Sequence, residues 1–234
     1  LAIVVSGLRT AVVQLDAARS GKTLRNFIRA GSASIVDLYA NINNSLYATD
    51  RSAASFERIA ERAVIDGFRA VKCAPFDEVL PSMDADLIIS NAQVGLERVR
   101  AVRNVIGENI NLLVDCHSRF TVDTALTVAM ELASIGVSWF EEPVDPVSDA
   151  AGLGAIARRI SMPVAGGEFG YGKDIFDRLL HQQAVSIVMP DIKYCGGVGE
   201  AVRAGRMATD RDRAVSFHSP SGPISLIASG HVTA

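Results

Sequence analysis

Residues 111–142 have the sequence NLLVDCHSRFTVDTALTVAMELASIGVSWFEE, which predicts a strand, a helix and a second strand. The first strand core, NLLV, is apolar without alternation, as expected where a parallel sheet is covered on both faces. The middle segment, 121–136, predicts an amphipathic helix and ends on glycine, a residue typical of helix C-termini. A strand–helix–strand segment of this kind is the repeating unit of a parallel sheet.

The same alternation extends over most of the chain, from about residue 35 onward, with another amphipathic helix predicted over 91–107. Seven strands are predicted, at residues 35–43, 70–73, 111–117, 138–142, 163–168, 186–191 and 214–218. Eight such units close a (β/α)8 TIM-type barrel of about 250 residues. We therefore predict an α/β barrel domain, strands one to seven, over residues 32–234. Residues 1–31 are expected to be a helical linker to a preceding domain, in an excerpt of a longer protein.

Composition excludes several classes of protein. The 234 residues are 49% apolar and 21% charged, with a net charge of −3 and a pI near 5.8, so disordered and fibrous classes are excluded. Nucleic acid and membrane surfaces are poor partners for a chain without a basic surplus, and a small soluble ligand is expected. The apolar opening is too short to span a membrane. The three cysteines are odd in number and widely spaced, which argues against a disulfide framework. Free cysteines are typical of a reducing compartment, so a cytoplasmic location is expected. We also expect a homo-oligomer.

Titratable side chains occur at the carboxyl ends of six predicted strands, the end where a barrel holds its active site. They are Lys72, Asp115 with His117, Glu141 with Glu142, Glu168, Asp191 and His218. Asp115, Glu141 and Glu168 follow at steps of 26 and 27 residues, close to one βα unit each. Each acid alone fits a solvated loop or an ion pair, but three at the same height would repel one another without a divalent cation. Their oxygen ligands favour Mg²⁺ over zinc.

Five short motifs fall on successive predicted strands: VDCH (114–117), WFEEP (139–143), PVAGGE (163–168), MPDIKYCGG (189–197) and SFHS (216–219). In this order and spacing they resemble the barrel domain of the enolase superfamily, specifically its mandelate racemase/muconate lactonizing subgroup. The resemblance covers the chain from about residue 35. It implies a modified (β/α)8 barrel whose N-terminal α+β capping domain and eighth strand lie largely outside this chain.

The resemblance also implies roles for the residues at the strand ends. The Mg²⁺ ligands would be Asp115, Glu141 and Glu168. Glu142 would lie behind them without touching the metal. Asp191 would orient the imidazole of His218 and raise its basicity, so that His218 serves as the catalytic base.

Lys72 matches the first lysine of the Lys-x-Lys pattern of mandelate racemase, whose implied role is to bind and polarise the substrate carboxylate. The run here is Lys72-Cys73-Ala74, so the second lysine, the usual base on the opposite face, is absent. This departure argues against two-base racemisation.

His117 follows the first predicted metal ligand by two residues, and this Asp-x-His pattern resembles acid-sugar dehydratases acting on galactonate or mannonate. In those enzymes the histidine protonates the departing hydroxyl. The resemblance therefore implies an acid-sugar substrate bound to Mg²⁺, removal of its α-proton by His218, and an enediolate held by the metal and Lys72. Loss of the 3-hydroxyl, assisted by His117, would give a 2-keto-3-deoxy acid.

Two other functions fit the same residues. A racemase, epimerase or cycloisomerase of the superfamily would share the metal and the His218–Asp191 pair. A non-catalytic, metal-dependent binding protein is disfavoured because every ligand and acid–base position carries a suitable side chain. The 152–157 segment, GLGAIA, imitates a dinucleotide fingerprint but follows a loop and lacks a ribose-binding acid. His181, His231 and the three cysteines are expected to be structural or exposed.

Overall fold

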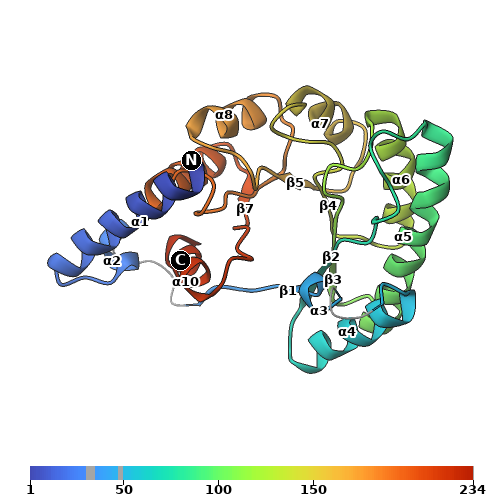
Figure 1. The fold of residues 1–234 in the computed structure, drawn as a ribbon, viewed down its shortest axis with the longest axis horizontal. Coiled ribbons are helices and arrows are strands. Elements are labelled where there is room, and N and C mark those ends of the chain that lie inside the picture. The colour runs from blue at the N-terminus through green and yellow to red at the C-terminus, as the bar shows by residue number, and fades with distance from the viewer. Residues whose placement is uncertain (30–34, 47–49, 234) are drawn as a thin grey trace. The chain divides into compact units, whose positions relative to one another are not determined.

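The computed structural model describes residues 1–29, 35–46 and 50–233 of the chain (Figure 1). Contacts within the chain divide it into two units. The central unit comprises Leu38–Val164, and the terminal unit comprises Leu1–Asp37 with Ala165–Ala234. Among the helices of the described residues, none is both long and apolar enough to cross a membrane.

The central unit contains a parallel set of strands. They are β1 (Ala40–Asn41), β2 (Ala70–Cys73), β3 (Asn111–Asp115) and β4 (Trp139–Glu141). Each pairs with the next in chain order, and the register between β3 and β4 sets Asp115 level with Glu141. The backbone NH of Phe140 donates to the carbonyl of Pro163 at 2.9 Å, which brings the segment before β5 (Val164–Gly166) alongside β4. The register therefore aligns the carboxyl ends of consecutive strands.

Helices connect these strands: α3 (Asn43–Leu46), α4 (Ala53–Ile65), α5 (Ala85–Ile106), α6 (Val122–Ser134) and α7 (Ala150–Ala157). Within this unit α4 packs against α5, α5 against α6, and α6 against α7, and Figure 1 shows α5 and α6 side by side. A capping box between Thr121 and Thr124 begins α6, which explains why the helix starts directly after the β3 loop. The two helices predicted over 91–107 and 121–136 fall within or overlap α5 and α6.

The segment 152–157 belongs to α7 and not to a phosphate-binding loop. The Asp149 carboxylate accepts a hydrogen bond from the backbone NH of Gly152 at 2.8 Å and so caps the helix itself. The negative charge of the Asp149 carboxylate at the N-terminus of α7 would repel a nucleotide phosphate there. This arrangement agrees with the rejection of a dinucleotide fingerprint.

The terminal unit contains β5 from Ala165 onward, β6 (Ile187–Val188) and β7 (Ala214–Val215), again parallel and paired in chain order. Its helices are α1 (Ala2–Arg19), α2 (Leu24–Ile28), α8 (Lys173–His181), α9 (Val198–Thr209) and α10 (Pro223–Thr233). α1 packs against α9, and the backbone NH of Gly196 donates to Ser6 Oγ at 3.0 Å. The domain boundary predicted after residue 31 lies within 30–34, outside the described residues.

The observed strands are shorter than predicted. The strands expected over 111–117 and 138–142 end at Asp115 and Glu141, because His117 and Glu142 have φ angles of 48° and 40°. Those left-handed conformations cannot continue a strand. Four other predicted strands are also longer than the observed ones. The structure has Ala40–Asn41 within the predicted 35–43, and Val164–Gly166 within 163–168. It has Ile187–Val188 within 186–191, and Ala214–Val215 within 214–218. Several predicted site residues consequently lie on the turns that follow the strands.

Candidate active site

A buried lysine joins two carboxylates at the ends of β2, β3 and β4 in the central unit. Lys72 is fully buried, and its Nζ lies 3.2 Å from Asp115 Oδ2. The same ammonium contacts Glu141 Oε1 directly. A buried charge requires such pairing, because desolvation of an isolated ion costs several kcal/mol. The three predicted residues therefore form one charged group.

The electrostatics of this group favour an ionised Asp115. Burial alone would raise the pKa of Asp115, but the Lys72 ammonium and the contacts with His117 lower it below its ordinary value. The carboxylate is therefore charged at neutral pH, which is the form that binds a metal ion.

His117 lies beside the same carboxylate. Its Nε2 is 3.3 Å from Asp115 Oδ2, and its backbone NH donates to Asp115 Oδ1 at 3.1 Å. The left-handed backbone at His117 turns the chain so that both contacts form. The side chain is 41% exposed, unlike the buried Asp115, so it can meet a molecule arriving from solvent.

Two aromatic residues of this site were missed by the sequence analysis. Trp139 Nε1 donates to Glu141 Oε2 at 3.1 Å, and the Tyr39 ring centroid lies 5.6 Å from Lys72 Nζ. The two rings also meet edge to face at 5.8 Å. Trp139 could have been found because it precedes Glu141 by two residues and so shares its face of the strand. Tyr39 carries no comparable signal, since it lies just before β1.

The terminal unit holds a second group, made of Glu168, Asp191 and His218. His218 Nδ1 lies 2.8 Å from Asp191 Oδ2, and His218 Nε2 lies 3.2 Å from Glu168 Oε2. The other oxygen of Asp191 accepts a hydrogen bond from the backbone NH of Lys193 at 2.7 Å. Because Asp191 is fully buried and bonded on both oxygens, it fixes the orientation of the imidazole. In this arrangement His218 Nδ1 faces the carboxylate of Asp191 and Nε2 faces that of Glu168.

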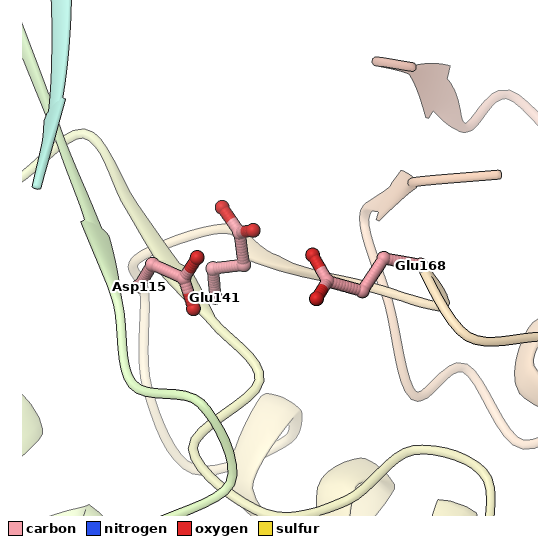
Figure 2. A group of neighbouring side chains, drawn as sticks. All are labelled: Asp115, Glu141 and Glu168. Carbon is pink, nitrogen blue, oxygen red and sulfur yellow. The ribbon is translucent and has the colours of Figure 1, made fainter. Parts of the chain in front are cut away.

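Figure 2 draws the three carboxylates that the sequence analysis predicts as metal ligands, Asp115, Glu141 and Glu168. Asp115 ends β3, Glu141 ends β4 and Glu168 follows β5, and all three side chains are buried. Within the central unit, one oxygen of Asp115 and one of Glu141 lie within 4.8 Å of each other. Clustered carboxylate oxygens are the donors that hard divalent cations prefer.

The other titratable side chains lie where the sequence analysis expected. All three cysteines are buried, and burial raises the pKa of Cys73 and Cys195 to about 12 and that of Cys116 well above its ordinary value. The three cysteines are therefore protonated thiols that contribute to the packing of the protein interior. His181 is exposed at the end of α8, and His231 is half-buried in α10.

Comparison with known proteins identifies the family. The family described as Enolase C-terminal domain-like matches residues 55–234. The chain belongs to the enolase superfamily. Its motifs and relatives place it in the mandelate racemase/muconate lactonizing subgroup. A solved structure of an enolase-superfamily member from Salmonella Typhimurium has a TM-score of 0.89 at 22% identity, covering 99% of this chain and 62% of that one. The predicted fold class, the barrel domain of this superfamily, is confirmed.

Curated members of the superfamily are similar in sequence. An arabinonate dehydratase from Saccharolobus solfataricus is 34% identical over 140 residues, which is 59% of this chain and 37% of that protein. A D-galactarolactone cycloisomerase from Agrobacterium fabrum is 29% identical over 208 residues, 88% of this chain and 50% of that protein. The chain spans at most half the length of these two enolase-superfamily relatives.

Proposed function

We propose that the protein removes the proton alpha to a carboxylate in a Mg²⁺-dependent reaction and dehydrates an acid sugar to a 2-keto-3-deoxy acid. The observation that carries this proposal is that two histidines at strand ends each contact a carboxylate. His218 pairs with Asp191, and His117 pairs with Asp115. The similarity to an arabinonate dehydratase supports the same reaction class.

The donor set fits a divalent cation. Asp115, Glu141 and Glu168 would hold Mg²⁺, and the bound cation would supply positive charge to stabilise the negative charge that develops on the substrate when its α-proton is removed. All three side chains are buried and offer hard oxygen ligands without a soft sulfur or imidazole donor among them.

His218 is proposed as the base. Its Nε2 can accept the α-proton while Asp191 holds Nδ1 and stabilises the imidazolium that results. The α-proton of a carboxylate is too weakly acidic for histidine alone, which is why this step needs the charge of the cation. Glu168 beside Nε2 places the base next to a proposed metal ligand.

His117 is proposed as the acid that protonates the departing 3-hydroxyl. Its exposed imidazole is accessible to a substrate, and its Nε2 lies 3.3 Å from Asp115 Oδ2. Lys72 would bind and polarise the substrate carboxylate.

A cycloisomerase or an epimerase is the second candidate, favoured by the similarity to the D-galactarolactone cycloisomerase. Two-base racemisation is less well supported, because Ala74 stands where the resemblance would place the second lysine. The residues that follow Lys72, Cys73 and Ala74, offer no second amine. The absence of that base favours dehydration.

A substrate screen tests the proposal. The purified protein with Mg²⁺ is incubated in D₂O with a panel of mono- and diacid sugars, and products are followed by NMR. A 2-keto-3-deoxy acid is the expected product. Deuterium at C2 without loss of water would instead establish an epimerase or racemase. Binding without any exchange at C2 would establish a binding protein and overturn the enzymatic proposal.

A further inference from the structure

The carboxylate of Glu141 is held on both of its oxygens by side chains of the central unit. Lys72 Nζ contacts Oε1, and the indole Nε1 of Trp139 donates a hydrogen bond to Oε2 at 3.1 Å. The Glu141 side chain is fully buried, so both contacts are shielded from water. A hydrogen bond from a neutral NH group to a carboxylate anion is stronger than one between neutral groups. Trp139 therefore contributes directly to the orientation of this carboxylate.

The position of the Trp139 indole follows from strand geometry. Trp139 precedes Glu141 by two residues in β4, so the two side chains lie on the same face of the strand. The register pairs Trp139 with Leu113 of β3. The indole is buried, and its ring meets the ring of Tyr39 edge to face at 5.8 Å. These contacts fix the NH donor in place beside the carboxylate.

The chemistry of indole limits what Trp139 can do at this site. Its NH group only donates hydrogen bonds and does not titrate, so it neither binds a metal ion nor exchanges a proton with a substrate. A glutamate side chain has one more rotatable bond than an aspartate, and ordering it on metal binding costs conformational entropy. A carboxylate oxygen that accepts a hydrogen bond can still coordinate a cation. Orientation of Glu141 before the cation arrives is the remaining role.

We propose that Trp139 is a positioning residue for the divalent cation, and that its indole NH holds Glu141 in the orientation that binds the ion. The inference rests on the proposed function, because that function makes Glu141 a Mg²⁺ ligand. It adds a residue to which the sequence analysis assigns no role. Hydrogen-bond partners behind metal ligands are known to orient those ligands and to raise metal affinity.

Calorimetric titration with MgCl₂ at constant ionic strength tests the inference. Trp139→Phe keeps an aromatic ring beside Tyr39 but removes the NH donor, and its Mg²⁺ affinity is expected to be about 10- to 100-fold weaker. Replacing Trp139 by β-(3-benzothienyl)alanine keeps the shape of indole with sulfur in place of the NH group. The same loss of affinity is expected, and this second replacement decides the question if Trp139→Phe fails to fold.

Phe140→Leu is the matched control for packing. Phe140 is fully buried in the same strand, but its side chain lies on the opposite face from Glu141. The change should lower the stability of the metal-free protein to urea, because it removes buried apolar surface. Its Mg²⁺ affinity should equal that of the wild type, since the hydrogen bond to Glu141 is retained.

The indole signal in NMR spectra provides a readout that needs neither metal nor turnover. Trp139 is the one tryptophan of the chain, so labelling tryptophan with ¹⁵N gives a single indole NH signal. In the metal-free protein, Glu141→Gln replaces the carboxylate by a neutral and weaker acceptor, so the indole proton signal should move upfield. Glu131→Gln, which changes an exposed glutamate of α6, should leave the signal where it is.

Several results would overturn the inference. Wild-type Mg²⁺ affinity in the benzothienyl variant is one, and an indole signal that Glu141→Gln does not move is another. An equal loss of affinity in Phe140→Leu would assign the effect to packing of β4 and not to the hydrogen bond.

Turnover separates this inference from the proposed function. If the wild type binds Mg²⁺ but converts no acid sugar, the proposed function is wrong, whereas weaker Mg²⁺ binding in both Trp139 variants still supports the positioning role. Wild-type protein that binds no Mg²⁺ would overturn both.

Discussion

The two histidines of the candidate site differ in their surroundings, and that difference separates their proposed roles. The His218 side chain is 14% exposed and lies between Asp191 and Glu168, whereas the His117 side chain is 41% exposed and contacts Asp115. A base that meets a carbon-bound proton benefits from a fixed, shielded position. An acid that meets a departing hydroxyl must be accessible to it.

Replacing each histidine by asparagine should therefore give different results. His218→Asn is expected to lose both exchange of the C2 proton and dehydration, because no enediolate forms without the base. His117→Asn is expected to lose dehydration more severely than exchange, by a factor of about 10² to 10⁴. NMR in D₂O measures both rates in the same sample.

The exposed His181 on α8 provides the control for these substitutions. His181→Asn should leave both rates unchanged, since it makes the same chemical change outside the site. Dehydration by His117→Asn at the wild-type rate would show that the general-acid role is wrong. An epimerase or cycloisomerase would then become the better description.

At the scale of the elements, one glycine determines how α5 packs. A Cβ added at Gly95 would lie 2.2 Å from Cδ1 of Phe76, whose ring is buried against the helix. Gly95→Ala is therefore expected to destabilise the protein by about 1–3 kcal/mol, because the ring or the helix must move. Gly7→Ala in α1 is the control: nothing lies within 4 Å of its added Cβ, so alanine should stabilise that helix by up to about 1 kcal/mol. Urea denaturation measures both, and equal effects would contradict the packing argument.

The segment between β2 and α5 is held by an ion pair that depends on pH. Arg98 lies buried in α5, and its guanidinium contacts both oxygens of Glu78 at 2.6 and 2.7 Å. Burial alone would raise the pKa of Glu78, but the hydrogen bonds and charge of Arg98 lower it below its ordinary value. Since the pKa is lower in the folded state, the stabilisation is fully present above the ordinary glutamate pKa and is lost as the pH falls through the folded value.

Glu78→Gln is expected to reduce the pH dependence of the free energy of unfolding between about pH 5 and pH 3. The wild-type protein should lose more stability over that window than the variant. Glu61→Gln, which changes an exposed glutamate on α4, controls for the general effect of removing one carboxylate. An identical pH profile for the wild type and Glu78→Gln would show that the ion pair contributes nothing to stability.

At the scale of the whole molecule, the sequence predicts the number and order of strands well, because uninterrupted apolar runs and helical periodicity are local properties. It predicts strand ends poorly: His117 and Glu142 have left-handed backbone conformations, and neither residue type announces such a turn in the sequence. The five motifs locate every site candidate except Lys72, which precedes the first of them along the chain. The pairing of Lys72 with Asp115 and Glu141 was not predictable, because it depends on which residues the register places side by side.

Mg²⁺ should stabilise the folded protein, because the proposed function assigns it three buried carboxylate ligands. A ligand that binds the folded state alone stabilises it by RT ln(1 + [L]/Kd), about 2.7 kcal/mol at a hundredfold excess over Kd. The thermal unfolding midpoint of the wild type should therefore rise with Mg²⁺ concentration. In Glu168→Gln the side chain keeps its size but loses the ligand charge, so the midpoint without metal should be similar and the rise with Mg²⁺ should disappear, together with turnover. A rise in Glu168→Gln equal to that of the wild type would show that the cation binds elsewhere, since this variant alters none of the other carboxylates.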